Sequence, residues 1–140
     1  MFQFVSDKRF DVAGFGTNAV DFLIEVPFYP TFNSKVELSR YVQMAGGEVA
    51  STMVGLQRLG LSTSYAGRFG SDAAGDIGIR SLADEGVDTE FVERISAAST
   101  QIAFIIVDEA SGERTVIWKR DQKLAYSPDD APLGAARECR

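Results

Sequence analysis

Glycines and polar side chains that could hold a ligand gather at two junctions of the sequence. At the first, Asn18 and Asp21 follow directly after the apolar run 10–16, and open α/β sheets bind ligands just beyond the C-terminal ends of their strands. At the second, Gly46 and Gly47 lead into an amphipathic segment. Adjacent glycines allow close backbone approach, and a helix start offers free N–H groups to a ligand's oxygens. A plain solvated turn is the alternative at each junction.

The composition narrows the chemistry that these junctions could perform. The chain has 140 residues, no histidine and a single cysteine, Cys139. The usual zinc sites, Ser/His or Cys/His nucleophiles and an internal disulfide are therefore excluded. Any chemistry must rest on carboxylates, hydroxyls, Lys, Arg, backbone N–H groups or a second molecule.

Charge and hydropathy exclude two classes of partner. The formal net charge is −6 and no run of Lys or Arg exceeds two residues, so the basic patch of a nucleic-acid or anionic-membrane binder is missing. No apolar run approaches the roughly 20 residues of a membrane helix, and the N-terminus lacks the apolar stretch of a signal peptide. We expect a cytoplasmic protein with no nucleic-acid or membrane partner.

A dinucleotide-binding fingerprint must also be considered. Gly14, Gly16 and Ala19 fit the pattern G-x-G-x-x-G/A. That pattern requires a helix beginning at its second glycine, whereas the sequence continues with the β-branched run VDFLIEV and then Pro27 and Pro30. A helix interior does not accept these prolines, so the context argues against a dinucleotide site.

Periodicity predicts an α/β core around the two junctions. Apolar side chains three or four apart favour a helix over residues 48–59, and residues 63–67 are typical of a short strand. A second helix is expected over residues 73–85. Strand and helix in alternation imply a parallel sheet with right-handed crossovers. Capping residues mark the expected helix boundaries: Gly60, Asp72 and Gly86.

The remaining segments are rich in β-structure. Prolines indicate a loop over residues 27–34, and imperfect alternation favours a half-exposed strand over 35–44. Residues 101–108 and 114–119 are typical of a hairpin, with Gly112 suited to its turn. This hairpin could cross the other β-rich segment, residues 22–44, making a small separate sheet beside the α/β core. Residues 88–94 are expected to be connecting structure, and residues 131–140 show no convincing period.

The motifs occur in an order that matches a known family. The chain resembles the N-terminal part of ribokinase-type (pfkB) carbohydrate kinases, a family that also includes adenosine kinases, over about residues 10–130. Each motif is weak alone, and their order and spacing make the resemblance specific. They are the G-x-x-x-x-D of residues 16–21, Ala45-Gly46-Gly47 with the helix end Arg58-Leu59-Gly60, the G-x-x-G-x-D-x-x-G of residues 67–75, Gly86-Val87-Asp88, and Thr100 with the hairpin through Gly112.

The resemblance implies an α/β fold, with the N-terminal half only of a ribokinase-like parallel-sheet core and a small β-sheet lid. The partial domain would span residues 1–130, followed by a polar tail over residues 131–140. Since the sheet would continue into further strands, one edge and one apolar face should be uncovered, and association or poor solubility is expected. The core would comprise about residues 8–26 and 46–100, and the lid about residues 27–45 and 101–119.

The family resemblance also implies an activity and a set of binding residues. Such kinases phosphorylate a hydroxymethyl group of a sugar or nucleoside with ATP and a divalent cation. Gly46-Gly47 would be both a sugar contact and the hinge of the lid, whose closure excludes water. Ser51 stands where the family signature has Asn, and a solvated strand-end charge is the alternative for Arg120. The implied substrate-binding residues are Asn18, Asp21, Gly46, Gly47, Ser51 and Arg120.

One family segment is not found in the 140 residues. The D-T-x-G-A-G-D signature, which in the family carries the catalytic-base Asp and the anion hole, occurs nowhere in the sequence. Phosphoryl transfer depends on such positioning and charge stabilisation, so we expect no catalytic, cofactor-binding or metal-binding residue here and no activity from this chain alone.

Other interpretations stay open beside this one. A non-catalytic module could bind a sugar or nucleoside, or dimerise through its lid strands. The resemblance could also be one of fold alone. A homodimer through the lid strands, or a C-terminal half supplied separately, are the expected protein partners, and ATP with Mg²⁺ is implied only for the full-length family.

Overall fold

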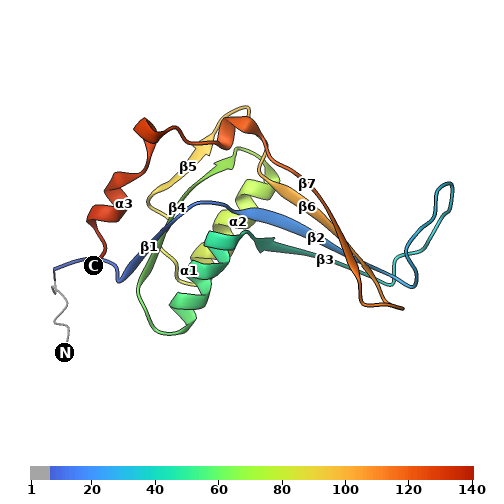
Figure 1. The fold of residues 1–140 in the computed structure, drawn as a ribbon. Helices are drawn as coiled ribbons and strands as arrows, with labels where there is room; N and C mark the ends of the chain where they lie inside the picture. The colour runs from blue at the N-terminus through green and yellow to red at the C-terminus, as the bar shows by residue number, and fades with distance from the viewer. Residues whose placement is uncertain (1–6) are drawn as a thin grey trace.

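Two sheets organise residues 7–140, the part of the chain that the computed structural model describes (Figure 1). One has three strands in the order β1-β4-β5, and the other has four in the order β3-β2-β6-β7. The elements are β1 (Val12–Phe15), β2 (Ala19–Val26), β3 (Arg40–Gly46), α1 (Glu48–Arg58), β4 (Thr63–Gly70), α2 (Ala73–Asp84), β5 (Val92–Ile95), β6 (Ile102–Asp108), β7 (Arg114–Lys119) and α3 (Leu133–Arg137), with short 3₁₀ turns at Gln122–Leu124 and Pro128–Asp130.

The three-stranded sheet is parallel throughout and carries both long helices. β4 pairs with β1 on one side and with β5 on the other. Tyr65 and Phe69 lie on the same face of β4, because successive strand residues alternate between faces, and both are almost completely buried. They form one core cluster with Met53 of α1 and Leu82 of α2. The predicted α/β core with a parallel sheet is confirmed.

Both predicted helices occur with the expected ends. Asp72 is the N-cap of α2, and its carboxylate accepts the backbone N–H of Gly75 at 2.9 Å. Gly60 and Gly86 follow the two helices with φ of 92° and 80°, a conformation that side chains disfavour. These local signals were sufficient because each depends on a few neighbouring residues.

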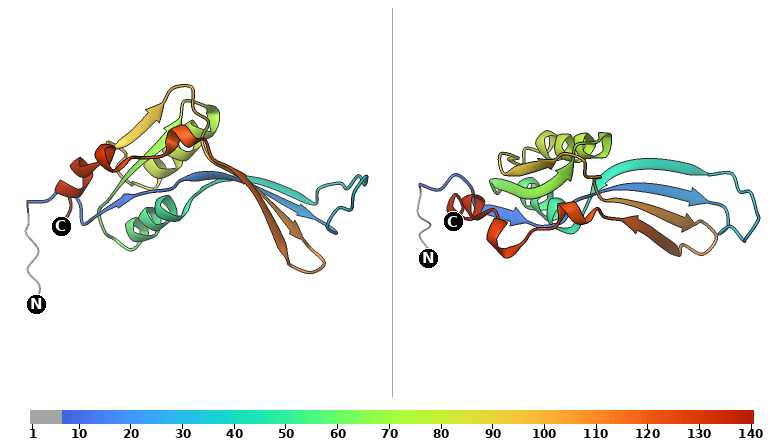
Figure 2. Two further views of the ribbon diagram at one scale, coloured as in Figure 1. Left: turned by 45° about the horizontal axis from the view of Figure 1, so that its top comes forward. Right: turned by 90° about the horizontal axis from the view of Figure 1, so that it is seen from above.

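The four-stranded sheet extends away from the helices on one side of the molecule (Figure 2). β2 is antiparallel to β3 and parallel to β6, and β6 and β7 form the predicted hairpin. The boundary between core and lid needs one correction, because residues 19–26 belong to this second sheet and not to the core sheet. An apolar, β-branched run suits either sheet, so its place is decided by its pairing partners. β3 begins only at Arg40, later than predicted.

The C-terminal residues are part of the folded unit, so the prediction of a polar tail over residues 131–140 was wrong. The Phe10 N–H donates to the Glu138 carbonyl at 3.1 Å, and the Arg140 N–H donates to the Phe10 carbonyl at 3.2 Å. These bonds surround a parallel bridge between Phe10 and Cys139, beside the start of β1. β5 was also missed. Each of these short segments is defined by a partner far away in the sequence, which local periodicity does not reveal.

Within residues 7–140, no helix has both the length and the apolar character needed to cross a membrane.

Candidate functional site

The Asp21 hollow lies where the four-stranded sheet meets the start of α1. Its volume is about 440 Å³. The register aligns Asp21 with Ala103 on β6 and Ala103 with Trp118 on β7, which places these side chains on one face of the sheet. The lining residues are Thr17, Ala19, Asp21, Gly47, Glu48, Gln101, Ala103, Val116, Trp118 and Arg120.

Asp21 is the acceptor of this hollow. Burial raises the pKa of its carboxyl group above the usual value. Among residues 7–140 the carboxylate has no hydrogen-bond donor and no ion-pair partner. A half-buried carboxylate without donors is an uncompensated cost to the fold, and hydroxyl groups of a ligand would supply what it lacks.

Gly46 and Gly47 bring the end of β3 and the start of α1 against β2. A Cβ at residue 46 would overlap the Asp21 carboxylate, and a Cβ at residue 47 would overlap the backbone of Asn18. Gly47 also has a φ of 98°, which disfavours any side chain. As the N-cap of α1, Gly47 offers no side-chain cap. The Ala50 N–H donates to the Thr17 carbonyl at 3.3 Å, so the backbone N–H groups of Glu48 and Val49 are those that the first turn offers to a ligand.

Asn18 lies behind this hollow and belongs to a buried network. The residue is 5% exposed, and its Nδ2 donates to the Tyr65 hydroxyl at 2.9 Å and to the Arg68 carbonyl at 3.1 Å. The Tyr65 hydroxyl donates in turn to the Gly16 carbonyl at 2.7 Å, and burial raises the pKa of Tyr65 to about 12. The Asn18 amide is therefore fixed by the core, a role that the sequence did not indicate.

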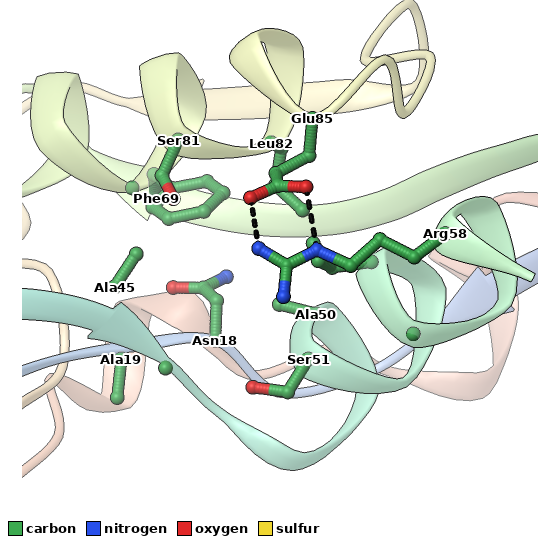
Figure 3. A pocket seen from close by; sticks show the side chains of 14 residues that line it. Asn18, Ala19, Ala45, Ala50, Ser51, Arg58, Phe69, Ser81, Leu82 and Glu85 are labelled. Carbon is green, nitrogen blue, oxygen red and sulfur yellow. Dashed lines mark hydrogen bonds and ion pairs between the residues drawn. The ribbon is translucent and has the colours of Figure 1, made fainter.

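Ser51 and Gly46 line a different space, the inter-helix cavity between α1 and α2 (Figure 3). Its volume is about 310 Å³. The six predicted binding residues thus divide into two groups: Asp21, Gly47 and Arg120 line the Asp21 hollow, and Asn18, Gly46 and Ser51 line the inter-helix cavity. The cavity is bounded by Asn18, Ala19, Ala45, Gly46, Ala50, Ser51, Val54, Gly55, Arg58, Phe69, Gly78, Ser81, Leu82 and Glu85.

Arg120 lies at the exposed end of β7 and also lines a neighbouring hollow of about 250 Å³. That hollow contains two residues that sequence reasoning missed, Arg68 and Tyr126. The Arg68 guanidinium lies 3.8 Å from the centre of the Tyr126 ring, and it donates to Glu93 at 2.8 Å and to Asp130 at 3.0 Å. Arg68 therefore fastens the segment after β7 to β4. Its only signal in the sequence was a charge directly after the strand predicted over residues 63–67, inside the G-x-x-G-x-D-x-x-G motif.

Comparison with known proteins identifies the family of this chain. The pattern of the pfkB family of carbohydrate kinases matches residues 11–138. The chain belongs to this family. It is 28% identical over 130 residues to the nucleoside kinase of Methanothermobacter thermautotrophicus. The matched region covers 91% of this chain and 42% of that protein.

Solved structures agree with this assignment. A fructokinase from Xylella fastidiosa superimposes with a TM-score of 0.62 at 32% identity, over 88% of this chain and 34% of that one. Arabidopsis thaliana ribokinase in complex with ribose and ATP gives a TM-score of 0.78 at 22% identity, over 92% of this chain and 43% of that one. The ribokinase-like fold is therefore shown, and the chain spans less than half the length of each of these proteins.

Membership of this family implies the use of ATP by its full-length members, one of which is solved with ATP bound. Within residues 7–140, no group of three or more Asp, Glu or Cys side chains could hold a metal ion.

Proposed function

We propose that this chain is the substrate-binding and lid part of an ATP-dependent kinase that phosphorylates an alcohol group of a sugar or nucleoside. Membership of the pfkB carbohydrate kinases supports the reaction class. The observation that carries the binding role is the unpaired, half-buried carboxylate of Asp21, which faces a hollow between the lid sheet and the start of α1.

The hollow suits a polyhydroxylated ligand. Asp21 would accept hydrogen bonds from two neighbouring hydroxyl groups, and the first-turn N–H groups of α1 would donate to ligand oxygens. Val116 and Trp118 supply an apolar wall that reduces contact with water, and Arg120 at the rim would bind a ligand oxygen. Ser51 and the Asn18 side chain line the other cavity, so we assign them no direct contact with the sugar.

The connection from β3 through Gly46-Gly47 to α1 joins the lid sheet to the core. A backbone free of side chains at this connection favours a hinge for lid closure. Closure would bring Trp118 over the ligand and exclude water from it. We propose further that this chain alone transfers no phosphate, that it works in the cytoplasm, and that its protein partner is a second copy or a separately supplied C-terminal half.

Isothermal titration of the chain with D-ribose, D-fructose and adenosine tests the binding role. Saturable binding of at least one of them is expected, and Asp21→Ala should weaken it by about tenfold or more, since a buried polar contact is lost. Glu37→Ala removes an exposed loop carboxylate and should leave binding unchanged. If Asp21→Ala binds as tightly as the native chain, the proposed site is wrong. Phosphate transfer from ATP by this chain alone would contradict only its inactivity.

An exposed apolar face supports a second role, association through the lid. On the face of the sheet opposite Asp21, Phe22 stacks on Phe104 with ring centres 5.0 Å apart and on Tyr41 with centres 6.3 Å apart. Tyr41 is 54% exposed and Ile117, the partner of Phe104 on β7, is 55% exposed. A non-catalytic dimerisation module would use the same face.

A further inference from the structure

Two facing stripes of residues, on α1 and on α2 with its C-cap, line the inter-helix cavity. The α1 stripe consists of Ser51, Val54, Gly55 and Arg58, and the α2 stripe consists of Gly78, Ser81, Leu82 and Glu85. Both follow the spacing i, i+3, i+4, i+7 that defines one face of a helix. The cavity shares only Ala19 with the Asp21 hollow, so it is a separate space.

Gly55 keeps the middle of this cavity open. A Cβ at residue 55 would meet no atom within 4 Å, whereas a Cβ at residue 78 would overlap the Phe69 ring. Packing therefore explains Gly78 and does not explain Gly55. Glycine inside a helix lowers its stability relative to alanine, so the native residue at 55 sacrifices helix stability and leaves space between the helices.

The inner wall of the cavity holds an unsatisfied acceptor. Since Asn18 Nδ2 is engaged by Tyr65 and Arg68, its Oδ1 is directed elsewhere, and this buried oxygen has no hydrogen-bond partner among residues 7–140. Figure 3 shows the amide projecting between Ala45 and Ala50, below the Phe69 ring. Such an orphan is costly. Because Oδ1 is shielded from water, a ligand would reach it after a small widening of the inter-helix cavity.

The mouth of the cavity offers a donor. Arg58 donates from Nε to Glu85 at 2.8 Å and from Nη2 to the second carboxylate oxygen. Its third nitrogen, Nη1, makes no hydrogen bond to any residue in the described part of the chain, and in Figure 3 it points toward Ala50 and Ser51. The cavity thus combines an acceptor inside and a cationic donor outside, and the almost completely buried Phe69 ring forms part of the wall between them.

From this arrangement we infer that the inter-helix cavity is a second binding site, for a small planar ring molecule that carries an N–H donor and a ring acceptor. The donor binds Asn18 Oδ1, the ring lies against Phe69, and the acceptor receives the Nη1–H of Arg58. A volume of about 310 Å³ lies at the lower end of small-molecule sites. This inference does not depend on the proposed kinase role.

Adenine is the probe, because it carries N–H donors and ring acceptors on a planar body, and 9-methylpurine, which keeps the ring acceptors but has no N–H group, is its control. Titration of the ¹⁵N-labelled full chain should shift the amide signals of Ser51, Gly55, Gly78 and Ser81. 9-Methylpurine should bind about tenfold more weakly, since it leaves Asn18 Oδ1 without a donor. Asp21→Ala should leave adenine binding unchanged, which separates this site from the proposed substrate site.

Gly55→Leu should abolish adenine binding by filling the cavity. Gly55→Ala should weaken adenine binding and raise the melting temperature. The alanine variant therefore tests the cavity even if the leucine variant folds poorly. Leu59→Ala, at an exposed residue just beyond α1, should change nothing. The inference is overturned if adenine gives no saturable shift at its solubility limit, if the shifts fall on Thr17, Asp21 and Arg120, or if Gly55→Ala and Gly55→Leu bind like the native chain.

Discussion

Thr100 and Asp72 join the lid to the core through two hydrogen bonds. The Thr100 hydroxyl donates to Asp72 Oδ1 at 2.7 Å and its backbone N–H donates to Oδ2 at 2.9 Å. The same hydroxyl accepts the Gly70 N–H at 2.9 Å. The Asp72 carboxylate and the Thr100 hydroxyl therefore connect the N-cap of α2, the end of β4 and the approach to β6.

Asp72→Ala removes the N-cap bond to Gly75 together with both bonds from Thr100. We expect the free energy of unfolding to fall by about 2–3 kcal/mol, the sum of a lost cap and unsatisfied partly buried donors. Urea denaturation followed by circular dichroism measures the change. Asp84→Ala, at an exposed residue of the same helix, should alter stability by less than about 0.5 kcal/mol. Equal effects of the two substitutions would contradict the role of Asp72.

The stabilisation by Asp72 should also depend on pH. Burial raises the pKa of this carboxyl group, but hydrogen bonds from Thr100 and Gly75 outweigh burial and hold the pKa below its usual value. A depressed pKa in the folded state contributes stability that is present above the unfolded pKa, about 3.9, and is lost as the pH falls through the folded value. The stability difference between the native chain and Asp72→Asn should therefore shrink below about pH 4. A difference that stays constant to pH 2 would argue against this linkage.

Asp21→Asn should raise the stability of the chain at pH 7 and weaken ligand binding. Burial raises the pKa of Asp21, so its ionised form opposes folding, and the folded state favours the protonated form. The variant should be more stable than the native chain at pH 7, and this advantage should disappear as the pH falls below the pKa of Asp21. Sugar or nucleoside binding should weaken at the same time. Thermal unfolding at pH 7 and pH 3 measures the first effect, and a variant less stable than the native chain at pH 7 would disprove it.

Local signals and long-range contacts explain which features the sequence could predict. Asp72 and Gly86 were identifiable because a helix end depends on the few residues around it. The direction of the Asn18 side chain was not, because it is held by Tyr65, 47 positions away. The pairing of residues 19–26 with β6 likewise depends on a strand about 80 residues later. The neighbourhood of Asp21 was therefore predictable, and the division into two cavities was not.

Gly47→Ala tests the close approach of the β3–α1 junction to β2. A Cβ there would overlap the backbone of Asn18, and the φ of 98° disfavours any side chain. We expect a loss of about 2–4 kcal/mol of stability, from backbone strain and overlap together. Gly112→Ala is the control, because its φ of 74° is also positive while a Cβ would meet nothing within 4 Å. It should cost about 1–2 kcal/mol, from strain alone. Similar losses at both positions in urea denaturation would show that the overlap is relieved without cost.

The exposed lid face should make the chain associate. Ile117 lies opposite Phe104 on this face, and both are substantially exposed; apolar patches of this kind mark protein interfaces. Sedimentation velocity at tens of micromolar should show a dimer or larger species, and Ile117→Lys should weaken association by about tenfold or more, because a buried charge opposes an apolar contact. Leu59→Lys makes the same change at an exposed leucine just beyond α1 and should leave association intact. A native chain that sediments as a single monomeric species would contradict association through the lid, and equal weakening by both substitutions would show that general solubility, and not this face, is responsible.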